Sequence, residues 1–277
     1  MAQPPSISDL VAQAGSGLTP TERSIAEVVL REPTLLAFGT VSELAQRVGT
    51  SRPSIVRFAH KLGLDGYTVL QERARGEVAR QLTRPSDRIR RAQASDDSVR
   101  ATVEGALDSV FALVNSNQLA GLVSPLVEAG QVWILSGETS KAGAYAFQSG
   151  LSMVRPGVHL LEDRSPDADL SDVAPGDVAV VFDFFRYRRS VARATQVLAD
   201  AGVRVLAITD SPLSPLVEWA DVWCEIKVPA VGPFDSSIPV VAVAELLVSR
   251  VAKELRDEAT RRVDRIEALW EKTEVFL

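Results

Sequence analysis

Five short apolar runs between residues 131 and 228 constrain the fold of this 277-residue chain more than any other feature. Each run is apolar at consecutive positions, and helical patterns follow the first, third and fifth. Such runs indicate strands covered on both faces, which is typical of the parallel sheet of an α/β domain. A ligand of such a sheet is expected at the carboxyl ends of its strands. The predicted strands are QVWILSG, GVHLLE, DVAVVFDF, VRVLAITD and DVWCEIKV.

The first 83 residues show a different pattern, which is helical throughout and has no strand-like alternation. Between the two patterns lies the polar, charged stretch TRPSDRIRRAQASDD, which Pro85 interrupts and which predicts a linker. We therefore expect a helical domain at 1–83, a linker at 84–97 and an α/β domain at 98–277. An amphipathic helix from Ser98 to Asn115 is expected to lead into the second domain.

The C-terminal region predicts a long helical run after Pro239 with a break near Asp257. Its last part, KELRDEATRRVDRIEALWEKTEVFL, alternates acids and bases at spacings of three and four residues around a few apolar positions. A helix of this kind usually covers a domain with its charged face in solvent, and it can also pack against a partner subunit.

Charge is distributed unevenly along the chain. The net charge of −6 and the pI of about 5.2 argue against a protein whose whole surface is basic and binds nucleic acid. Residues 52–91, however, carry ten Lys and Arg against four Asp and Glu, and such a local basic region is the electrostatic footprint of a nucleic-acid-binding element.

The sequence lacks the residues that several kinds of functional site require. Cys224 is the single cysteine, so an intrachain disulfide is excluded and a buried reduced thiol is expected. With only His60 and His159 beside it, no metal site is expected. No Gly-x-Gly-x-x-Gly fingerprint follows a strand and no Walker-type loop is present, so we expect no cofactor. The N-terminus lacks a signal-like apolar run and no apolar stretch approaches the roughly 18 residues of a membrane span, so a cytoplasmic location is the default expectation.

The segment TVSELAQRVGTSRPSIVRFAHKLG predicts two short helices separated by a turn at Gly49. Thr40 and Glu43 have the Thr-x-x-Glu spacing of a capping box at the start of the first helix. Ser51 is expected to cap the second helix, and Pro53 falls in its first turn, where a missing N–H costs nothing.

The second of these helices has two different faces. At 100° per residue, Ile55, Phe58, Ala59 and Leu62 share an apolar side. A helix with small polar residues in its first turn and cations one turn later is suited to the major groove of DNA. The alternative is a helical hairpin whose basic face is merely solvated. The residues opposite the apolar side are Pro53, Ser54, Arg57, His60 and Lys61.

Residues Leu18 to Gln71 resemble the N-terminal domain of RpiR-type bacterial transcriptional regulators. The resemblance lies in the opening Leu-Thr-x-x-Glu-Arg, in Leu44-Ala45 before the turn, in Ser-x-x-Ile-Val-Arg-Phe and in Lys-Leu-Gly-x-x-Gly-Tyr. It implies a helix-turn-helix (HTH) domain joined to a sugar-isomerase-type (SIS) domain, in a homodimer or homotetramer that binds operator DNA. Arg57 is the best candidate for contacting guanine or phosphate. The DNA-binding positions that the resemblance implies are Ser51, Arg52, Ser54, Arg57 and Lys61.

Residues from about 131 to 228 are similar to a SIS domain, most clearly in VRVLAITDSPLSPLVEWADV. The resemblance implies a flavodoxin-like fold with a parallel five-stranded sheet, and a phosphosugar held by hydroxyls and backbone amides after the first and third strands. After the first strand, Ser136, Thr139 and Ser140 supply hydroxyls and Gly137 permits close approach.

The loop after the third strand departs from this family. The Ser-x-Ser-Gly-x-Thr loop of the family falls on Asp183-Phe184-Phe185-Arg186-Tyr187-Arg188, so both serines, the glycine and the threonine are replaced. Three hypotheses remain open: an altered anion site that uses Arg186, Arg188 or Arg189, an oligomerisation surface made by the aromatic residues, and a direct contact with nucleic acid. The candidate ligand-binding residues are Ser136, Thr139, Ser140, Asp183, Arg186, Tyr187 and Arg188.

These observations predict a DNA-binding transcriptional regulator of sugar or related carbon metabolism that responds to a small anion, a sugar phosphate or a sugar acid. The alternatives are a SIS-fold sugar-phosphate isomerase and a ligand-free oligomerisation module. An isomerase needs a carboxylate and a histidine for proton transfer. Glu138 and Glu245 could supply the carboxylate, but His60 lies on the predicted DNA-binding helix and His159 in a predicted strand, so we expect no enzymatic activity.

Overall fold

The computed structural model divides into two compact units, Met1–Ala92 and Gln93–Leu277. It describes Pro5 and residues 7–82, 85–91, 96–115, 117–161, 170–212 and 214–276. The division falls inside the predicted linker, of which Arg84 and residues 92–95 lie outside the described residues. Pro85 begins helix α7 (Pro85–Arg91) and does not interrupt a coil, because a proline is tolerated in the first turn of a helix.

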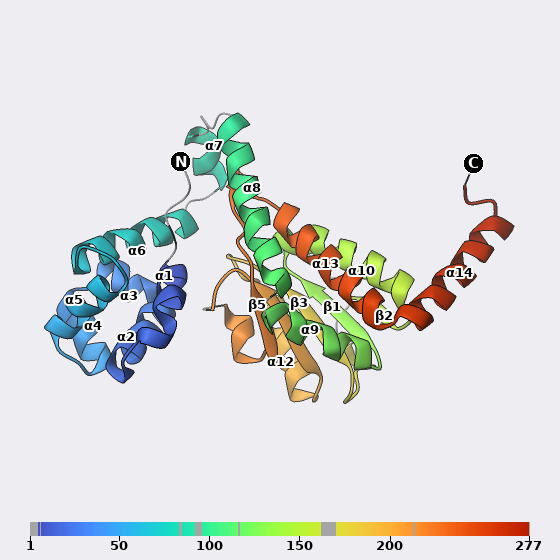
Figure 1. Ribbon diagram of the computed structural model, residues 1–277, viewed down its shortest axis with the longest axis horizontal. Helices are drawn as coiled ribbons and strands as arrows, with labels where there is room; N and C mark the ends of the chain where they lie inside the picture. Colours follow the sequence, from blue (N-terminus) through green and yellow to red (C-terminus); the bar gives the residue numbers. More distant parts are fainter. Residues whose placement is uncertain are drawn as a thin grey trace. The chain divides into compact units, whose positions relative to one another are not determined.

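The first unit is helical in every described element, as predicted (Figure 1). Its core contains fully buried side chains from four successive helices, among them Ile25, Leu36, Leu44 and Phe58. The helices are α1 (Ile7–Ala14), α2 (Pro20–Arg31), α3 (Pro33–Phe38), α4 (Val41–Val48), α5 (Arg52–Lys61) and α6 (Tyr67–Leu82).

Local signals in the sequence set the start and end of α4. The capping box is confirmed: the Thr40 amide donates to Glu43 Oε2 at 2.7 Å, and the Glu43 amide donates to Thr40 Oγ1 at 3.2 Å. Gly49 ends α4 with a φ of 75°, in the left-handed region that favours glycine. A second capping box, Thr19 with Glu22, starts α2 and was not predicted, although the same Thr-x-x-Glu spacing is present.

The second unit contains the predicted parallel sheet, with strand order β2-β1-β3-β4-β5. Ser136 at the end of β1 is in register with Phe182 at the end of β3. A small antiparallel hairpin, β6 (Ala230–Val231) with β7 (Phe234–Asp235), was not predicted, because two-residue strands leave no periodic signal. The five strands are β1 (Val132–Ser136), β2 (Val158–Leu160), β3 (Val178–Phe182), β4 (Arg204–Thr209) and β5 (Val222–Glu225).

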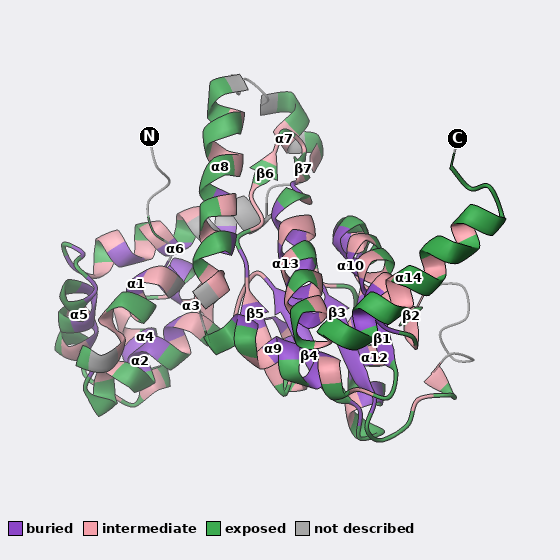
Figure 2. Ribbon diagram, turned by 45° about the vertical axis from the view of Figure 1, so that its right-hand side comes forward, coloured by how far each residue is buried: buried purple, intermediate pink, exposed green. Residues whose placement is uncertain are grey.

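Helices cover both faces of this sheet, which explains its runs of consecutive apolar residues (Figure 2). Alternate side chains such as Ile134 and Val180 pack with α9, α10 and α13, while Leu135 and Val181 pack with α12 on the other face. Cys224 is a fully buried free thiol, as expected. The helices of this unit are α8 (Asp96–Ala112), α9 (Asn117–Glu128), α10 (Lys141–Val154), α12 (Arg189–Asp200), α13 (Ile238–Glu254) and α14 (Arg256–Lys272).

The order of the strands places a topological switch point between β1 and β3. The chain leaves β1 through α10 toward β2 on one side, and it leaves β3 through α12 toward β4 on the other side and the opposite face. In sheets of this kind ligands bind in the crevice at the carboxyl ends of these two strands. Gly137 and Asp183 directly follow these strands, so they lie at the expected binding position.

Among the described residues, no single helix is long and apolar enough to cross a membrane. The bent pair Asp97–Ala112 and Asn117–Glu128 reaches that length and apolarity only when the two helices are counted together.

Candidate functional site

Helix α5 presents a polar surface opposite a fully buried one. Ile55, Phe58 and Ala59 have no exposed surface, whereas Ser51, Arg52, Arg57 and Lys61 are exposed and Ser54 is half-buried. All five predicted DNA-binding residues therefore lie on the solvent side of this helix. This arrangement is the one that a recognition helix requires.

The polar side chains on α5 contact one another. Ser51 Oγ and Ser54 Oγ are 2.9 Å apart, and Arg57 Nη2 donates to Ser54 Oγ at 3.0 Å. The structure corrects one expectation here: Ser51 occupies the N-cap position, but its hydroxyl does not bond to a helix amide. The contact with Ser54 uses that hydroxyl instead, and it aligns Ser51, Ser54 and Arg57 along one exposed line.

The basic residues of α5 have an acidic neighbour on α2. The amide of Thr19 lowers the pKa of Glu22 most, and the charges of Lys61 and Arg57 lower it further. Glu22 therefore lies within electrostatic reach of both cations. His60 differs from them, since its Nδ1 lies 3.1 Å from the carbonyl oxygen of Leu64 and the ring is held against its own chain.

In the second unit, Ser140 joins the ends of β1 and β3. Its hydroxyl lies 2.6 Å from the carbonyl oxygen of Phe182 and 3.0 Å from that of Gly137, and it donates to these oxygens. The Gly137 amide also donates to Phe182 O, at 2.9 Å. Ser140 is fully buried, whereas Ser136 is half-buried and Thr139 is exposed. Of the three predicted hydroxyl residues, Ser136 and Thr139 are therefore accessible to solvent.

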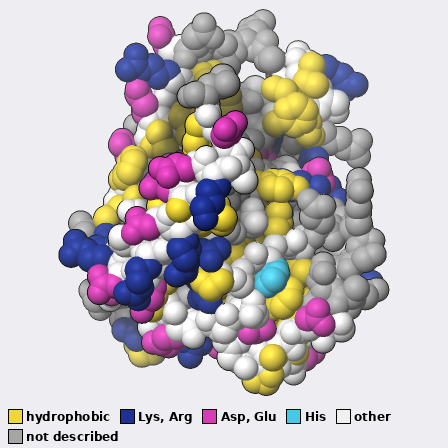
Figure 3. Space-filling model, turned by 90° about the vertical axis from the view of Figure 1, so that its right-hand side faces the viewer, with side chains coloured by type: hydrophobic (Ala, Val, Ile, Leu, Met, Phe, Trp, Pro, Cys, Tyr) yellow, Lys and Arg dark blue, Asp and Glu magenta, His cyan; other side chains and the backbone are white. Residues whose placement is uncertain are grey.

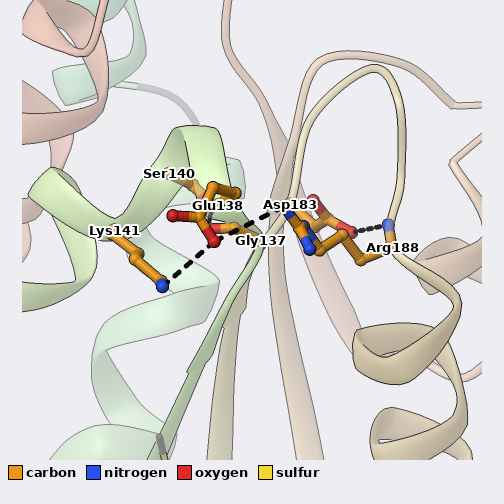
Figure 4. A network of polar contacts seen from close by, with 6 residues as sticks. All are labelled: Gly137, Glu138, Ser140, Lys141, Asp183 and Arg188. Atoms are coloured by element: carbon orange, nitrogen blue, oxygen red, sulfur yellow. Dashed lines mark hydrogen bonds and ion pairs between the residues drawn. The ribbon is translucent and has the colours of Figure 1, made fainter. Parts of the chain in front are cut away.

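Asp183 fills the space between the two strand ends (Figure 4). A Cβ atom on Gly137 would overlap Asp183 Oδ1 and lie 2.9 Å from Asp183 Cγ, so only glycine fits opposite this carboxylate. Asp183 Oδ1 accepts the Phe184 amide at 3.1 Å, and Oδ2 accepts the Arg188 amide at 2.9 Å. Burial raises the pKa of Asp183 to about 6, against the effect of these two hydrogen bonds.

A second carboxylate, the partly buried Asp210 after β4, holds the other half of the same loop. It accepts the Phe185 amide at 3.0 Å and the Tyr187 hydroxyl at 2.6 Å. Burial raises the pKa of Asp210 and also that of Tyr187. The loop from 183 to 188 is therefore tied down by two aspartates, and sequence reasoning missed the contribution of Asp210 because it comes from a neighbouring strand.

The backbone of this loop places Arg186 in the left-handed region, with a φ of 74°. This is the position onto which the glycine of the family loop falls, and the left-handed region is the one that favours glycine. Phe184 is buried in the core of its own unit, so it cannot contribute to the aromatic oligomerisation surface that the sequence suggested.

Two cations lie at the mouth of the crevice. Lys141 Nζ and Arg188 Nη2 are 3.0 Å and 3.4 Å from the same oxygen, Oε2 of Glu138 (Figure 4). All three side chains are about half exposed, and the hydrogen bond from Lys141 lowers the pKa of Glu138. The structure thus brings Ser140, Asp183 and the Arg188 backbone together, while the side chains of Arg186 and Arg189 remain exposed.

In the loops after β1, β3 and β4, as far as the structure describes them, there is no histidine. His159 lies on edge strand β2, stacked on Trp133 with ring centroids 4.6 Å apart and with Nε2 2.9 Å from Gln131 Oε1. In the described part of the chain, no three His, Cys, Asp or Glu side chains form a group that could hold a metal ion.

Two family models match the chain. One, described as the helix-turn-helix domain of the rpiR family, matches residues 6–81, and one for the SIS domain matches residues 126–250. A curated relative, an HTH-type transcriptional regulator of Caldanaerobacter subterraneus subsp. tengcongensis, is 25% identical in an alignment of 269 residues that covers 92% of this chain and 93% of the relative. The HTH-type transcriptional regulator HexR of Pseudomonas aeruginosa is also 25% identical, over 84% of this chain and 85% of HexR.

Two solved structures share the fold. The sugar isomerase domain of an RpiR transcription factor from Sphaerobacter thermophilus has a TM-score of 0.59 and 22% identity, and it covers 62% of this chain and 97% of that domain. The Vibrio vulnificus NanR protein complexed with ManNAc-6P has a TM-score of 0.58 and 16% identity, with 95% of this chain and 98% of NanR covered. The chain therefore carries a helix-turn-helix domain of the rpiR family followed by a SIS domain, and over most of its length it is similar to HTH-type transcriptional regulators.

Proposed function

We propose that this regulator binds a pseudo-palindromic operator through α5 as a homo-oligomer, and that a small anion at the strand ends of its SIS domain controls the binding. The observation that carries the proposal is the exposed line of Ser51, Ser54 and Arg57 on a helix whose other face is completely buried. Serine hydroxyls and a guanidinium can reach phosphates and base edges, and guanine offers two acceptors to arginine. Arg52 and Lys61 flank this line and are proposed to contact phosphates.

The proposed assembly is a homodimer or homotetramer whose subunits pair through the outer part of α14. Leu269 on this helix and Phe276 after its end are 58% and 71% exposed, in a segment that is otherwise rich in charge. Residues 261–265 carry three arginines against one aspartate, and residues 267–274 carry three glutamates against one lysine. Two copies of α14 in antiparallel orientation would therefore bring a basic half against an acidic half. Figure 3, viewed from the side where α14 lies in Figure 1, shows charges of both signs mixed with hydrophobic side chains.

An oligomer also suits the DNA side of the proposal. Two DNA-binding heads on one operator bind far more tightly than one, because the second contact is intramolecular. A ligand that changes the separation of the heads would change the occupancy of the operator, since the half-sites lie at a set spacing.

The proposed effector is a small anion related to sugar metabolism. NanR holds the sugar phosphate ManNAc-6P, so a sugar-derived anion is a reasonable class for a relative of the same fold. In this chain Lys141 and Arg188 surround a carboxylate oxygen of Glu138, and a ligand carboxylate of similar geometry could replace it. Ser136, Thr139, Arg186 and Tyr187 are proposed to line the surroundings of this site.

We propose that the protein is a regulator without enzymatic activity and that it acts in the cytoplasm, where a bacterial operator lies. Isomerisation between adjacent carbons needs a positioned acid and base. The histidines are held by Leu64 O and by the Trp133 and Gln131 side chains, and neither lies in the strand-end loops. Glu138 is engaged by two cations.

Selection of genomic fragments by the purified full chain tests the proposed function. We expect enrichment of a short pseudo-palindromic sequence, with binding that weakens steeply as salt rises because phosphate contacts release counterions. The genes beside the enriched site would then indicate the metabolite class. A chain that enriches no sequence, and that shows no salt-dependent affinity for DNA, would refute the proposal.

A further inference from the structure

The crevice between β1 and β3 is closed by a side chain of the protein itself. The register of Ser136 with Phe182 sets the next residues, Gly137 and Asp183, side by side at the switch point. Asp183 Oδ1 occupies the space that any side chain at position 137 would need. A ligand that entered the crevice as far as the strand ends would therefore meet a buried carboxylate.

Five backbone amides in the loops after β1 and β3 already have acceptors within the protein. Phosphate groups bind to free N–H groups at loops and helix starts, because these groups point partial positive charge at the anion. Here a phosphate would have to displace either a carbonyl or an aspartate from each donor. The donor and acceptor pairs are Gly137 to Phe182 O, Ser140 to Gly137 O, Phe184 and Arg188 to Asp183, and Phe185 to Asp210.

We infer that Asp183 determines the specificity of this SIS domain: its carboxylate takes the position of a ligand phosphate and excludes phosphate monoesters from the crevice. This inference rests on the proposed function only in assigning the effector site to these strand ends. A phosphate monoester carries about 1.5 to 2 negative charges at neutral pH, and a like charge a few ångströms away disfavours it strongly.

The remaining ligand class consists of anions that carry a carboxylate and no phosphate. Such a ligand can place its single charge at the mouth, between Lys141 and Arg188, without reaching Asp183. The existing contacts of both cations with Glu138 Oε2 show that a carboxylate fits between them.

Replacement of Asp183 by serine in the full chain tests this inference. Serine removes the charge, leaves space opposite Gly137 and keeps a hydroxyl for the loop. The ligands are a hexose 6-phosphate and the sugar acid of the same carbon skeleton, and the readouts are thermal shift and calorimetry in the absence of DNA. Asp200→Ser is the matched control, because Asp200 is an exposed aspartate at the end of α12 that leads away from the crevice.

We expect the wild type and Asp200→Ser to show no shift with the sugar phosphate. Asp183→Ser is expected to gain binding, with a rise in melting temperature of roughly 5–10 °C when the ligand is at about 100 times its Kd. If circular dichroism shows that Asp183→Ser is unfolded, Asp183→Asn removes the charge alone, and a smaller gain is expected. A wild type that binds the sugar phosphate, or folded variants that gain no binding, would overturn the inference. Because DNA is absent from this assay, its outcome is separate from that of the operator selection.

Discussion

At the scale of single residues, Asp183 couples the stability of the second unit to pH. Burial raises the pKa of this carboxyl to about 6, whereas an aspartate in an unfolded chain has a pKa near about 3.9. Between these values the folded state binds a proton that the unfolded state does not bind. The stabilisation is therefore complete below about pH 4 and is lost as the pH rises through about 6.

This sign leads to a prediction for Asp183→Asn. On going from pH 7.5 to pH 4.5, the free energy of unfolding of the wild type should increase relative to that of the variant by on the order of 2 kcal/mol. Denaturant unfolding of both proteins at the two pH values measures it, and the comparison removes the contribution of carboxyls that both proteins share. A difference that stays constant with pH would show that Asp183 is not a buried charged group.

Arg186 gives a second prediction at this scale. A left-handed conformation costs a non-glycine residue roughly 1 kcal/mol, and Arg186 is an exposed residue with φ 74°. Arg186→Gly should therefore leave the free energy of unfolding unchanged or raise it by up to about 1 kcal/mol, and Arg186→Ala should not raise it. Urea denaturation compares the two variants, and a loss of more than about 1 kcal/mol in Arg186→Gly would argue against a strained loop.

At the scale of secondary-structure elements, the sequence predicts well whatever depends on local pattern. The five strands follow from burial on both faces, and the turn at Gly49 and the capping box of α4 follow from residue chemistry a few positions apart. The break after α13 falls at Leu255, close to the expected position. The periodicity of a sequence reflects which residues are buried and which local hydrogen bonds form. These elements were predicted because burial and local hydrogen bonds determine them.

The candidate site was predicted less completely, because its geometry depends on residues far apart in the sequence. The closure of the crevice joins Gly137 to Asp183, and Asp210 reaches back to Phe185 and Tyr187 from the next strand. A sequence shows that the phosphate-binding residues are replaced, but not that a carboxylate fills their space. The hydroxyl of Ser140 is predicted as a ligand contact, and the sequence did not predict its hydrogen bond to Phe182 O at the end of the neighbouring strand.

The outer part of α14 gives a prediction at the element scale. In the proposed oligomer Leu269→Glu would place a charge in the subunit interface, so we expect this variant to be monomeric at micromolar concentration. Val197→Glu is the matched control, because Val197 is a 49% exposed apolar residue on α12 and should leave the assembly intact. Light scattering coupled to size exclusion distinguishes the two. A monomeric wild type, or a Leu269→Glu variant that keeps the mass of the wild type, contradicts this interface.

At the scale of the whole molecule, the chain combines a DNA-binding unit and a SIS unit, each with its own hydrophobic core. The two halves of the account are therefore tested separately. In the proposed function, the first unit selects the operator, and the second unit forms the oligomer and selects the anion. The negative charge of the whole chain is compatible with this division, since the basic residues that would meet DNA are concentrated between 52 and 91.

The most direct test of the central claim is the affinity of Arg57→Ala for the selected operator and for random DNA, with Arg31→Ala as the control. Arg31 is an exposed arginine of the same unit on α2, paired with Glu27 at 2.9 Å. We predict that Arg57→Ala loses about 1–3 kcal/mol of operator affinity, roughly 5- to 150-fold, and prefers the operator less over random DNA, while Arg31→Ala binds as the wild type does. If Arg57→Ala binds both DNAs as the wild type does, α5 does not read the operator through Arg57 and the account is wrong.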